Sequence, residues 1–147
     1  MIPTIYAGFW LRFAAVLVDV LAMFIPFCIV TFFAIVFTKL VSAARGYDPA
    51  VVILTVLPPV MIVATWLYFA VMESSSWQAT IGKKVFGLYV TDLEARRLTL
   101  SRATGRTFAK YLSSLTAGVG YALCGFTNKK QALHDMVANC LVLRRPQ

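Results

Sequence analysis

Three charged residues, Arg12, Asp19 and Asp135, have types and positions that could do chemistry. Asp19 lies in a run of 26 residues, Phe13 to Thr38, with no other charge. If a helix enters a membrane near Phe9, ten residues at about 1.5 Å each place Asp19 roughly 15 Å deep, the middle of a hydrocarbon core of about 30 Å. A carboxylate there costs about 2.5 to 3.5 kcal/mol. It is the group that a carrier needs to bind Na⁺ or a proton in turn.

Arg12 and Asp19 cannot easily neutralise each other. They are seven residues apart and share a helix face, but about 10.5 Å of rise separates them. Asp135 is available to Arg12 if the C-terminal part of the chain folds back under the helices, and Glu73 is a further partner. The charges therefore predict either an ion site or a salt-bridge network that locks helix packing.

The composition indicates one integral membrane domain covering residues 1–147. Hydrophobic residues make up 60% of the chain and charged residues only 14%, against about 25% in soluble domains. The net charge of +8 would suit nucleic acid, but membrane proteins collect Lys and Arg on their cytoplasmic side. We therefore expect no nucleic-acid partner.

Three apolar stretches organise the chain. Two predict transmembrane helices, at about residues 9–38 and 50–72. The third, predicted as a helix at about 107–127, is weaker because it is rich in Ser, Thr and Gly. We expect it to be re-entrant or to lie in the membrane plane, with a third complete crossing as the alternative.

The placement of basic residues favours two crossings. All but Lys39 and Arg45 of the 14 basic residues share one side if the C-terminal tail lies with the loop 73–110. The positive-inside rule then predicts that the N-terminus, this loop and the C-terminus are cytoplasmic. The predicted location is the cell inner or plasma membrane.

The stretch between the helices has the two-residue alternation of strands. Residues 85–92 and 97–100 predict a short cytoplasmic β-hairpin that turns at 93–96, to which 140–143 could add. A helix should begin near Ser101, with a basic face resting on anionic lipid headgroups, formed by Arg102, Arg106 and Lys110. The predicted fold class is an all-α membrane protein, a small bundle with this hairpin attached.

Two motifs that would suggest an enzyme are incomplete. T-I-G-K-K at Thr80 to Lys84 lacks the Gly at Trp77 and the Ser or Thr at Lys84 that a phosphate-binding loop requires. His134 is the only histidine, so a metal-ligand set of histidines cannot form. We therefore expect no enzyme activity, no metal and no cofactor.

Three blocks in order resemble the RDD family and cover nearly the whole chain. They are A-G-F-W-L-R-F-A-A-V-L-V-D at 7–19, W-Q-A-T-I-G-K-K-V-F-G-L-Y-V-T-D at 77–92 and K-K-Q-A-L-H-D-M-V-A-N at 129–139. The resemblance assigns the Arg and the two Asp of the family name to Arg12, Asp19 and Asp135. It implies a small inner-membrane protein, and some relatives are associated with exchange of Na⁺ or other monovalent cations for protons. Asn139-Cys140 departs from the Gly-Thr common in relatives, which bears on the turn before the last strand.

Two functional hypotheses follow. In the first, the chain is a transporter or transporter subunit in which Asp19 binds a monovalent cation or proton, gated by Arg12 and Asp135. In the second, it is a non-transporting scaffold or accessory protein whose three charges are structural. Expected partners are the lipid bilayer, its anionic headgroups, monovalent cations or protons, and a second copy or a membrane complex. Supporting site residues are Glu73, His134, Gly82 and Lys83.

Overall fold

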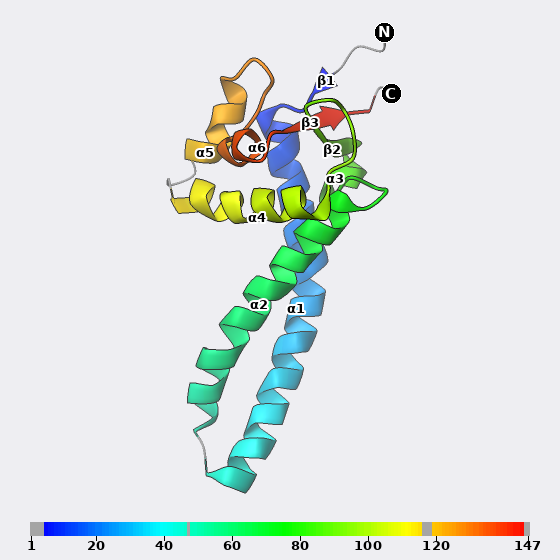
Figure 1. Cartoon of the computed structure of the whole chain (residues 1–147). Coiled ribbons are helices and arrows are strands. Elements are labelled where there is room, and N and C mark those ends of the chain that lie inside the picture. Colours follow the sequence, from blue (N-terminus) through cyan, green and yellow to red (C-terminus); the bar gives the residue numbers. More distant parts are fainter. Residues whose placement is uncertain (1–4, 47, 116–118, 146–147) are drawn as a thin grey trace.

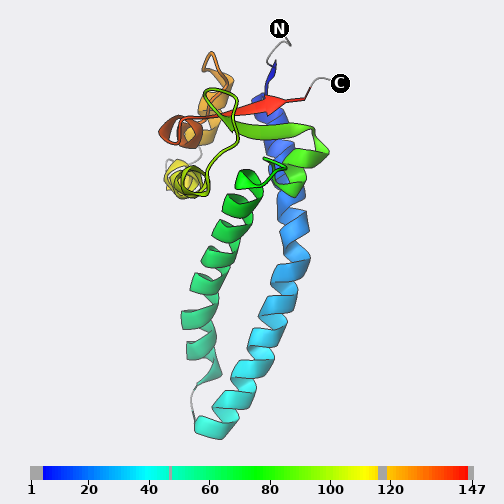
Figure 2. The same ribbon diagram turned by 45° about the vertical axis from the view of Figure 1, so that its right-hand side comes forward.

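Two long antiparallel helices form a hairpin that carries a small head at one end (Figures 1 and 2). This computed structural model describes residues 5–46, 48–115 and 119–145. Helix α1 spans Phe9–Arg45 and α2 spans Pro49–Ser74. Both predicted spans are therefore present, and each helix extends beyond its predicted bounds.

Local sequence signals end α1 and start α2 at the far tip of the hairpin. Gly46 adopts the left-handed conformation, φ 72°, and its N–H donates to the carbonyl of Ser42 at 2.8 Å. Glycine has no Cβ to oppose this conformation, so α1 stops here. The Asp48 carboxylate then caps α2 by accepting the N–H of Ala50 at 2.9 Å, and Pro49 occupies the first turn, which requires no N–H.

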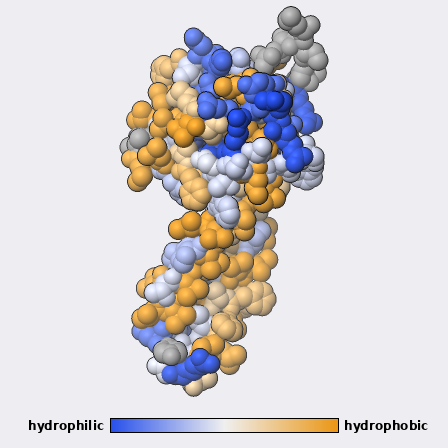
Figure 3. Space-filling view, in the orientation of Figure 1, coloured by the Kyte–Doolittle hydropathy of each residue, from blue (hydrophilic) through white to orange (hydrophobic). Residues whose placement is uncertain are grey.

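The hairpin exposes the surface that a bilayer would cover. Both helices are long and apolar enough to cross a membrane, and the most apolar windows contain no buried residues. Large side chains such as Phe24, Phe37 and Leu54 are more than 60% exposed. Apolar colour covers most of the hairpin, while strongly hydrophilic residues gather on the head (Figure 3). This surface is typical of helices that face lipid.

The head combines short helices with a three-stranded antiparallel sheet. Strand β3, Cys140–Arg144, lies between β1, Ile5–Tyr6, and β2, Leu88–Asp92. Tyr6 and Tyr89 both pair with Leu143. The helical segments around the sheet are α3 (Ile81–Val85), α4 (Leu100–Leu115), α5 (Val119–Ala122), the 3-10 turn η1 (Leu123–Gly125) and α6 (Leu133–Val137).

The predicted β-hairpin is only partly correct. Residues 88–92 form a strand and the chain turns at 93–96, but the second arm is limited to one bridge between Thr91 and Arg97. The Asp92 carboxylate accepts hydrogen bonds from the N–H groups of Glu94 and Arg96, and these bonds stabilise the turn at 93–96. The main partner of β2 is instead β3, at the position where a strand was expected to add.

The predicted third helix at 107–127 has the wrong bounds. Helix α4 begins at Leu100 and crosses the end of the hairpin instead of running along it (Figures 1 and 2). Beyond residues 116–118, which lie outside the described residues, α5 folds back on α4, and the Tyr121 hydroxyl donates to the carbonyl of Lys110 at 3.1 Å. Gly120 permits this approach because a Cβ there would lie 2.9 Å from the Cβ of Ser113. The stretch is therefore not one straight helix.

The core of the head joins the first and last parts of the chain. Buried Ala7 and Ala15 pack with residues of the sheet, among them Leu88, Val90 and Val142. Residues 5–6, 75–99 and 119–145 consequently lie at the same end of the hairpin (Figure 1).

Candidate functional site

Asp19 is buried between α1, α2 and α3 and is fully engaged by the protein. Its carboxylate accepts hydrogen bonds from the hydroxyl of Thr80 at 2.6 Å, the hydroxyl of Tyr68 at 2.7 Å and the N–H of Gly82 at 2.7 Å. The residue is only 2% exposed. We call these four residues the Asp19 pocket. All three donors are neutral groups.

The Asp19 pocket depends on a close approach between α3 and α1. A Cβ on Gly82 would lie 1.9 Å from the carbonyl oxygen of Ala15. Only glycine lets the backbone of α3 come near enough for its N–H to reach the carboxylate. Thr80 caps α3, with its hydroxyl 3.4 Å from the N–H of Lys83, and also donates its proton to Asp19.

A second cluster of charges joins the head to the hairpin. Arg106, on α4, donates to Glu73 of α2 and, from Nε at 2.9 Å and a terminal nitrogen at 2.7 Å, to Asp135 of α6. Arg12 of α1 donates to the other oxygen of Asp135. Lys83 Nζ lies 2.5 Å and Lys110 Nζ 3.2 Å from the same oxygen of Glu73. We call this set the ion network; its members are Arg12, Glu73, Lys83, Arg106, Lys110 and Asp135.

The ion network is buried as well as charged. Glu73 and Asp135 are 0% exposed and Arg106 is 1% exposed. Burial alone would raise the pKa of Asp135, but Arg106 and Arg12 outweigh it and hold this pKa well below its usual value. Asp135 is therefore ionised at neutral pH, and its charge is balanced by two guanidinium groups.

His134 lies beside the ion network without joining it as a cation. Its Nδ1 is 3.3 Å from the hydroxyl of Ser113, and its Nε2 is 3.5 Å from Asp135. Burial lowers the pKa of His134 to about 3, and the nearby Arg106 adds to the effect although Asp135 opposes it. Ser113 and Asp135 are also buried, so this Ser-His-Asp set has no open face for a substrate.

The two clusters meet on α3. The N–H of Gly82 binds Asp19, and the side chain of the next residue, Lys83, binds Glu73. One short helix therefore contacts α1 through the Asp19 pocket and α2 through the ion network.

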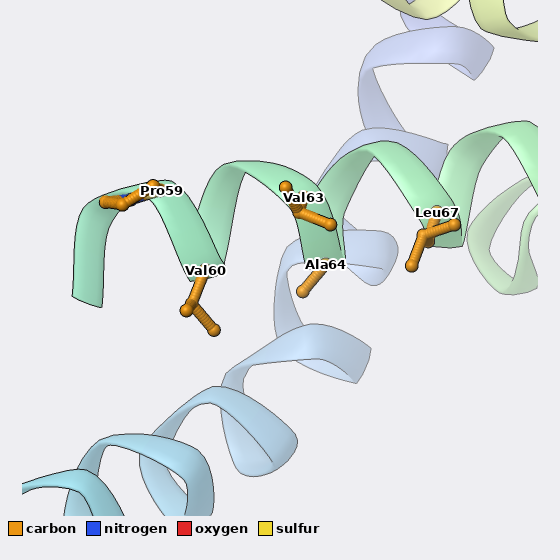
Figure 4. Close-up of a pocket in the computed structure, with 5 residues that line it drawn as sticks. All are labelled: Pro59, Val60, Val63, Ala64 and Leu67. Atoms are coloured by element: carbon orange, nitrogen blue, oxygen red, sulfur yellow. The ribbon is translucent and has the colours of Figure 1, made fainter. Parts of the chain in front are cut away.

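A different hollow lies along the hairpin. Figure 4 shows it on one side of α2, and its lining consists of apolar side chains: Pro59, Val60, Val63, Ala64 and Leu67. None of them can offer a charged or hydroxyl group to a cation. In the described part of the chain, no three His, Cys, Asp or Glu side chains gather closely enough to hold a metal ion.

Comparison with known proteins assigns the chain to a family. The profile of the RDD family matches residues 6–139. The chain belongs to the RDD family. It is also 32% identical to the uncharacterized protein YxaI of Bacillus subtilis (strain 168), over 93% of this chain and 96% of that protein. No solved structure matches it.

The structure separates the three charges of the RDD name into two groups. Arg12 contacts Asp135, the pairing that the sequence suggested if the C-terminal part folds back. Asp19 contacts neither of them. Its carboxylate lies in the Asp19 pocket and accepts hydrogen bonds from three neutral groups. The supporting residues Glu73 and Lys83 belong to the ion network, Gly82 to the Asp19 pocket, and His134 borders the network.

Several residues of this RDD site were missed or misread in the sequence. The expected basic face on lipid headgroups is wrong for Arg106 and Lys110, which turn into the protein toward Glu73. Only Arg102, with a side chain 48% exposed, remains near the surface. Tyr68 lies in the second apolar stretch, whose pattern did not indicate its contact with Asp19, and Thr80 was considered only in the incomplete phosphate-loop motif. A usable signal for Thr80 was its place before Ile-Gly-Lys-Lys, where a hydroxyl caps a helix.

Proposed function

We propose that this RDD protein is a non-transporting membrane scaffold or accessory protein. The hairpin anchors it, and the head is the part that meets other molecules. The observation that carries the proposal is the position of Arg106, which bridges Glu73 at the end of α2 and Asp135 in the head. A buried arginine that holds two carboxylates from different elements ties these elements together. Each carboxylate has other basic partners, but among the described residues only Arg106 contacts both.

The Asp19 pocket supports the same proposal. A carrier carboxylate must exchange its partners, whereas that of Asp19 holds three protein donors at 2.6 to 2.7 Å. The hollow of Figure 4 adds no polar lining along the hairpin. Both features suit a rigid joint better than a path for an ion.

The head is proposed to face the cytoplasm at the inner or plasma membrane. Of the 14 Lys and Arg residues, only Lys39 and Arg45 belong to the other end of the hairpin. This distribution is the one that the positive-inside rule associates with the cytoplasmic side. A basic head there suits anionic headgroups or an acidic surface of a membrane complex.

A second candidate function is transport of a monovalent cation or proton with Asp19 as the binding carboxylate. One observation favours it: among the described residues, Asp19 forms no ion pair with a basic side chain, and its three donors are neutral. A buried carboxylate without a countercharge is where a proton or small cation can be stabilised.

One experiment separates the two functions. Purified protein is reconstituted in liposomes, and cation-driven proton flux is measured against Na⁺, K⁺ and Li⁺ gradients for wild type and Asp19→Asn. Asp48→Asn is the matched control, because Asn also caps helices well and Asp48 lies at the opposite tip. The scaffold proposal expects no flux above protein-free liposomes and a lower unfolding temperature for Asp19→Asn alone. Flux in wild type that Asp19→Asn abolishes, in a variant that still folds, overturns it in favour of transport.

A further inference from the structure

Helix α4 has two unlike faces. One packs into the head, with Ala103, Arg106 and Ser113 at 0 to 1% exposure. The other is apolar and open, and its residues follow the i, i+3, i+4, i+7 spacing of a single helix face: Phe108 (55%), Tyr111 (39%), Leu112 (50%) and Leu115 (83%). A soluble head would have little reason to leave this face uncovered.

The open face of α4 adjoins the hairpin surface that meets lipid. Trp66 of α2 donates its indole N–H to the hydroxyl of Thr104 at 3.3 Å, and its ring lies 6.5 Å from that of Phe108. The next residue of α2, Leu67, is itself 45% exposed. The exposed apolar surface therefore continues from α2 onto α4, which runs across the hairpin (Figures 1 and 2).

A second apolar patch lies beside the other helix of the hairpin. Ile81 and Val85 of α3 are 41% and 65% exposed, and α3 packs on α1. Helices α3 and α4 lie on different sides of the hairpin (Figure 1). A medium that surrounds the hairpin covers both patches, whereas one protein partner would cover one of them.

The contacts also give the depth of α4. Trp66 reaches α4, and Tyr68, two residues later on α2, reaches Asp19, so α4 and Asp19 lie at nearly the same level of the hairpin. The 19 residues between Asp19 and Lys39 extend about 28 Å at roughly 1.5 Å each, close to the thickness of a hydrocarbon core.

From these observations we propose that α4 lies in the membrane plane at the lipid–water interface, with Phe108, Tyr111, Leu112 and Leu115 among the upper acyl chains. The boundary of the hydrocarbon core then lies at the level of Asp19. The sequence had instead suggested that Asp19 lies roughly 15 Å inside this core. Amphipathic helices with aromatic residues bind at this boundary. This inference goes beyond the proposed function, since it holds for a scaffold or a carrier alike.

Depth-dependent quenching tests the proposal. Single cysteines replace Leu112 or Leu115 in a Cys28→Ser background, and bimane attached to them is quenched by lipids brominated near the headgroup or near the chain end. Cys124 and Cys140 are buried and remain unlabelled in folded protein. Leu54→Cys is the deep control, about 18 Å along α2 from Trp66, and Arg97→Cys is the water control.

The expected result is a loss of fluorescence at positions 112 and 115 that is larger with the shallow than with the deep bromines, and the reverse at 54. Quenching no stronger than at 97 means that water or protein covers this face, and quenching like that at 54 means that α4 is deeper; each overturns the proposal. If a leucine variant labels Cys124 or Cys140, its head has opened, and Tyr111→Cys on the same face replaces it.

Discussion

The backbone N–H of Gly82 donates to the carboxylate of Asp19 at 2.7 Å, and the same glycine leaves no room for a side chain against α1. Glycine is thus required at this point for a steric reason that also creates the hydrogen bond. This approach is one of the contacts that attach the head to α1, together with the ion pair of Arg12 and Asp135.

Gly82→Ala should therefore lower the free energy of unfolding by about 1 to 3 kcal/mol, the usual cost of overpacking, because its Cβ would meet the Ala15 carbonyl. Chemical unfolding in detergent micelles measures this. Gly105→Ala is the control: Gly105 is helical and exposed, with nothing within 4 Å of an added Cβ, so the change should stabilise by about 0.5 to 1 kcal/mol. Equal effects of the two changes would contradict the packing described.

Arg106→Met should cost about 3 to 5 kcal/mol, because it leaves the buried carboxylates of Glu73 and Asp135 without their shared partner. Arg106→Lys should fall between this variant and wild type, since one ammonium cannot reach both carboxylates as a guanidinium does. The unfolding midpoint of purified protein reports both. Arg97→Met, at an exposed position, should change stability by less than about 0.5 kcal/mol. If Arg106→Met lowers stability no more than Arg97→Met does, the ion network does not hold the head on the hairpin.

His134 should make the protein less stable in weak acid. Its pKa is lowered to about 3 in the folded state from 6.5, so between these values the unfolded chain binds more protons. Stability then rises with pH across this window and is lost as pH falls from 6.5, by at most about 1.4 kcal/mol per unit. Because the chain has one histidine, His134→Gln should flatten the slope between pH 6.5 and 5. An unchanged slope would assign the effect to other groups.

Asn139, just before β3, has φ 50°, in the left-handed region. Glycine adopts this conformation without strain, and Asn is among the few other residues that tolerate it. Asn139→Gly should keep stability within about 0.5 kcal/mol, whereas Asn139→Val should lose about 1 to 2 kcal/mol. Thermal unfolding of the two variants measures these changes. If Asn139→Val leaves the stability unchanged, the turn can adopt another backbone conformation at no cost, which contradicts the prediction.

The apolar runs were enough to predict α1 and α2, because a bilayer demands uninterrupted apolar length and little else. The sequence offered Asp135 as a partner for Arg12 on the condition that the C-terminal part folds back, with Glu73 as a further candidate, and the structure shows the contact with Asp135. The family blocks at 77–92 and 129–139 include α3 and α6, which contribute Gly82, Lys83 and Asp135 to the candidate site.

The role of Arg106 could not be predicted, because its spacing from Arg102 and Lys110 is the same for a lipid-facing stripe and for a buried ion pair. Only the tertiary position of Glu73 decides between them. The second arm of the β-hairpin stops at the Thr91–Arg97 bridge for a similar reason. Gln78 takes the N–H and the carbonyl of Val90 on that edge of β2, and α4 already begins at Leu100, which strand propensity at 97–100 did not reveal.

The central position of β3 in the sheet has a consequence for biosynthesis. This strand leaves the ribosome last among the described elements, yet β1 and β2 have no contact in the sheet except through it. The sheet of the head therefore cannot close until residues 140–144 have been synthesised. A nascent chain that stops before residue 135 already contains both Glu73 and Arg106, but its Arg12 still lacks the carboxylate of Asp135.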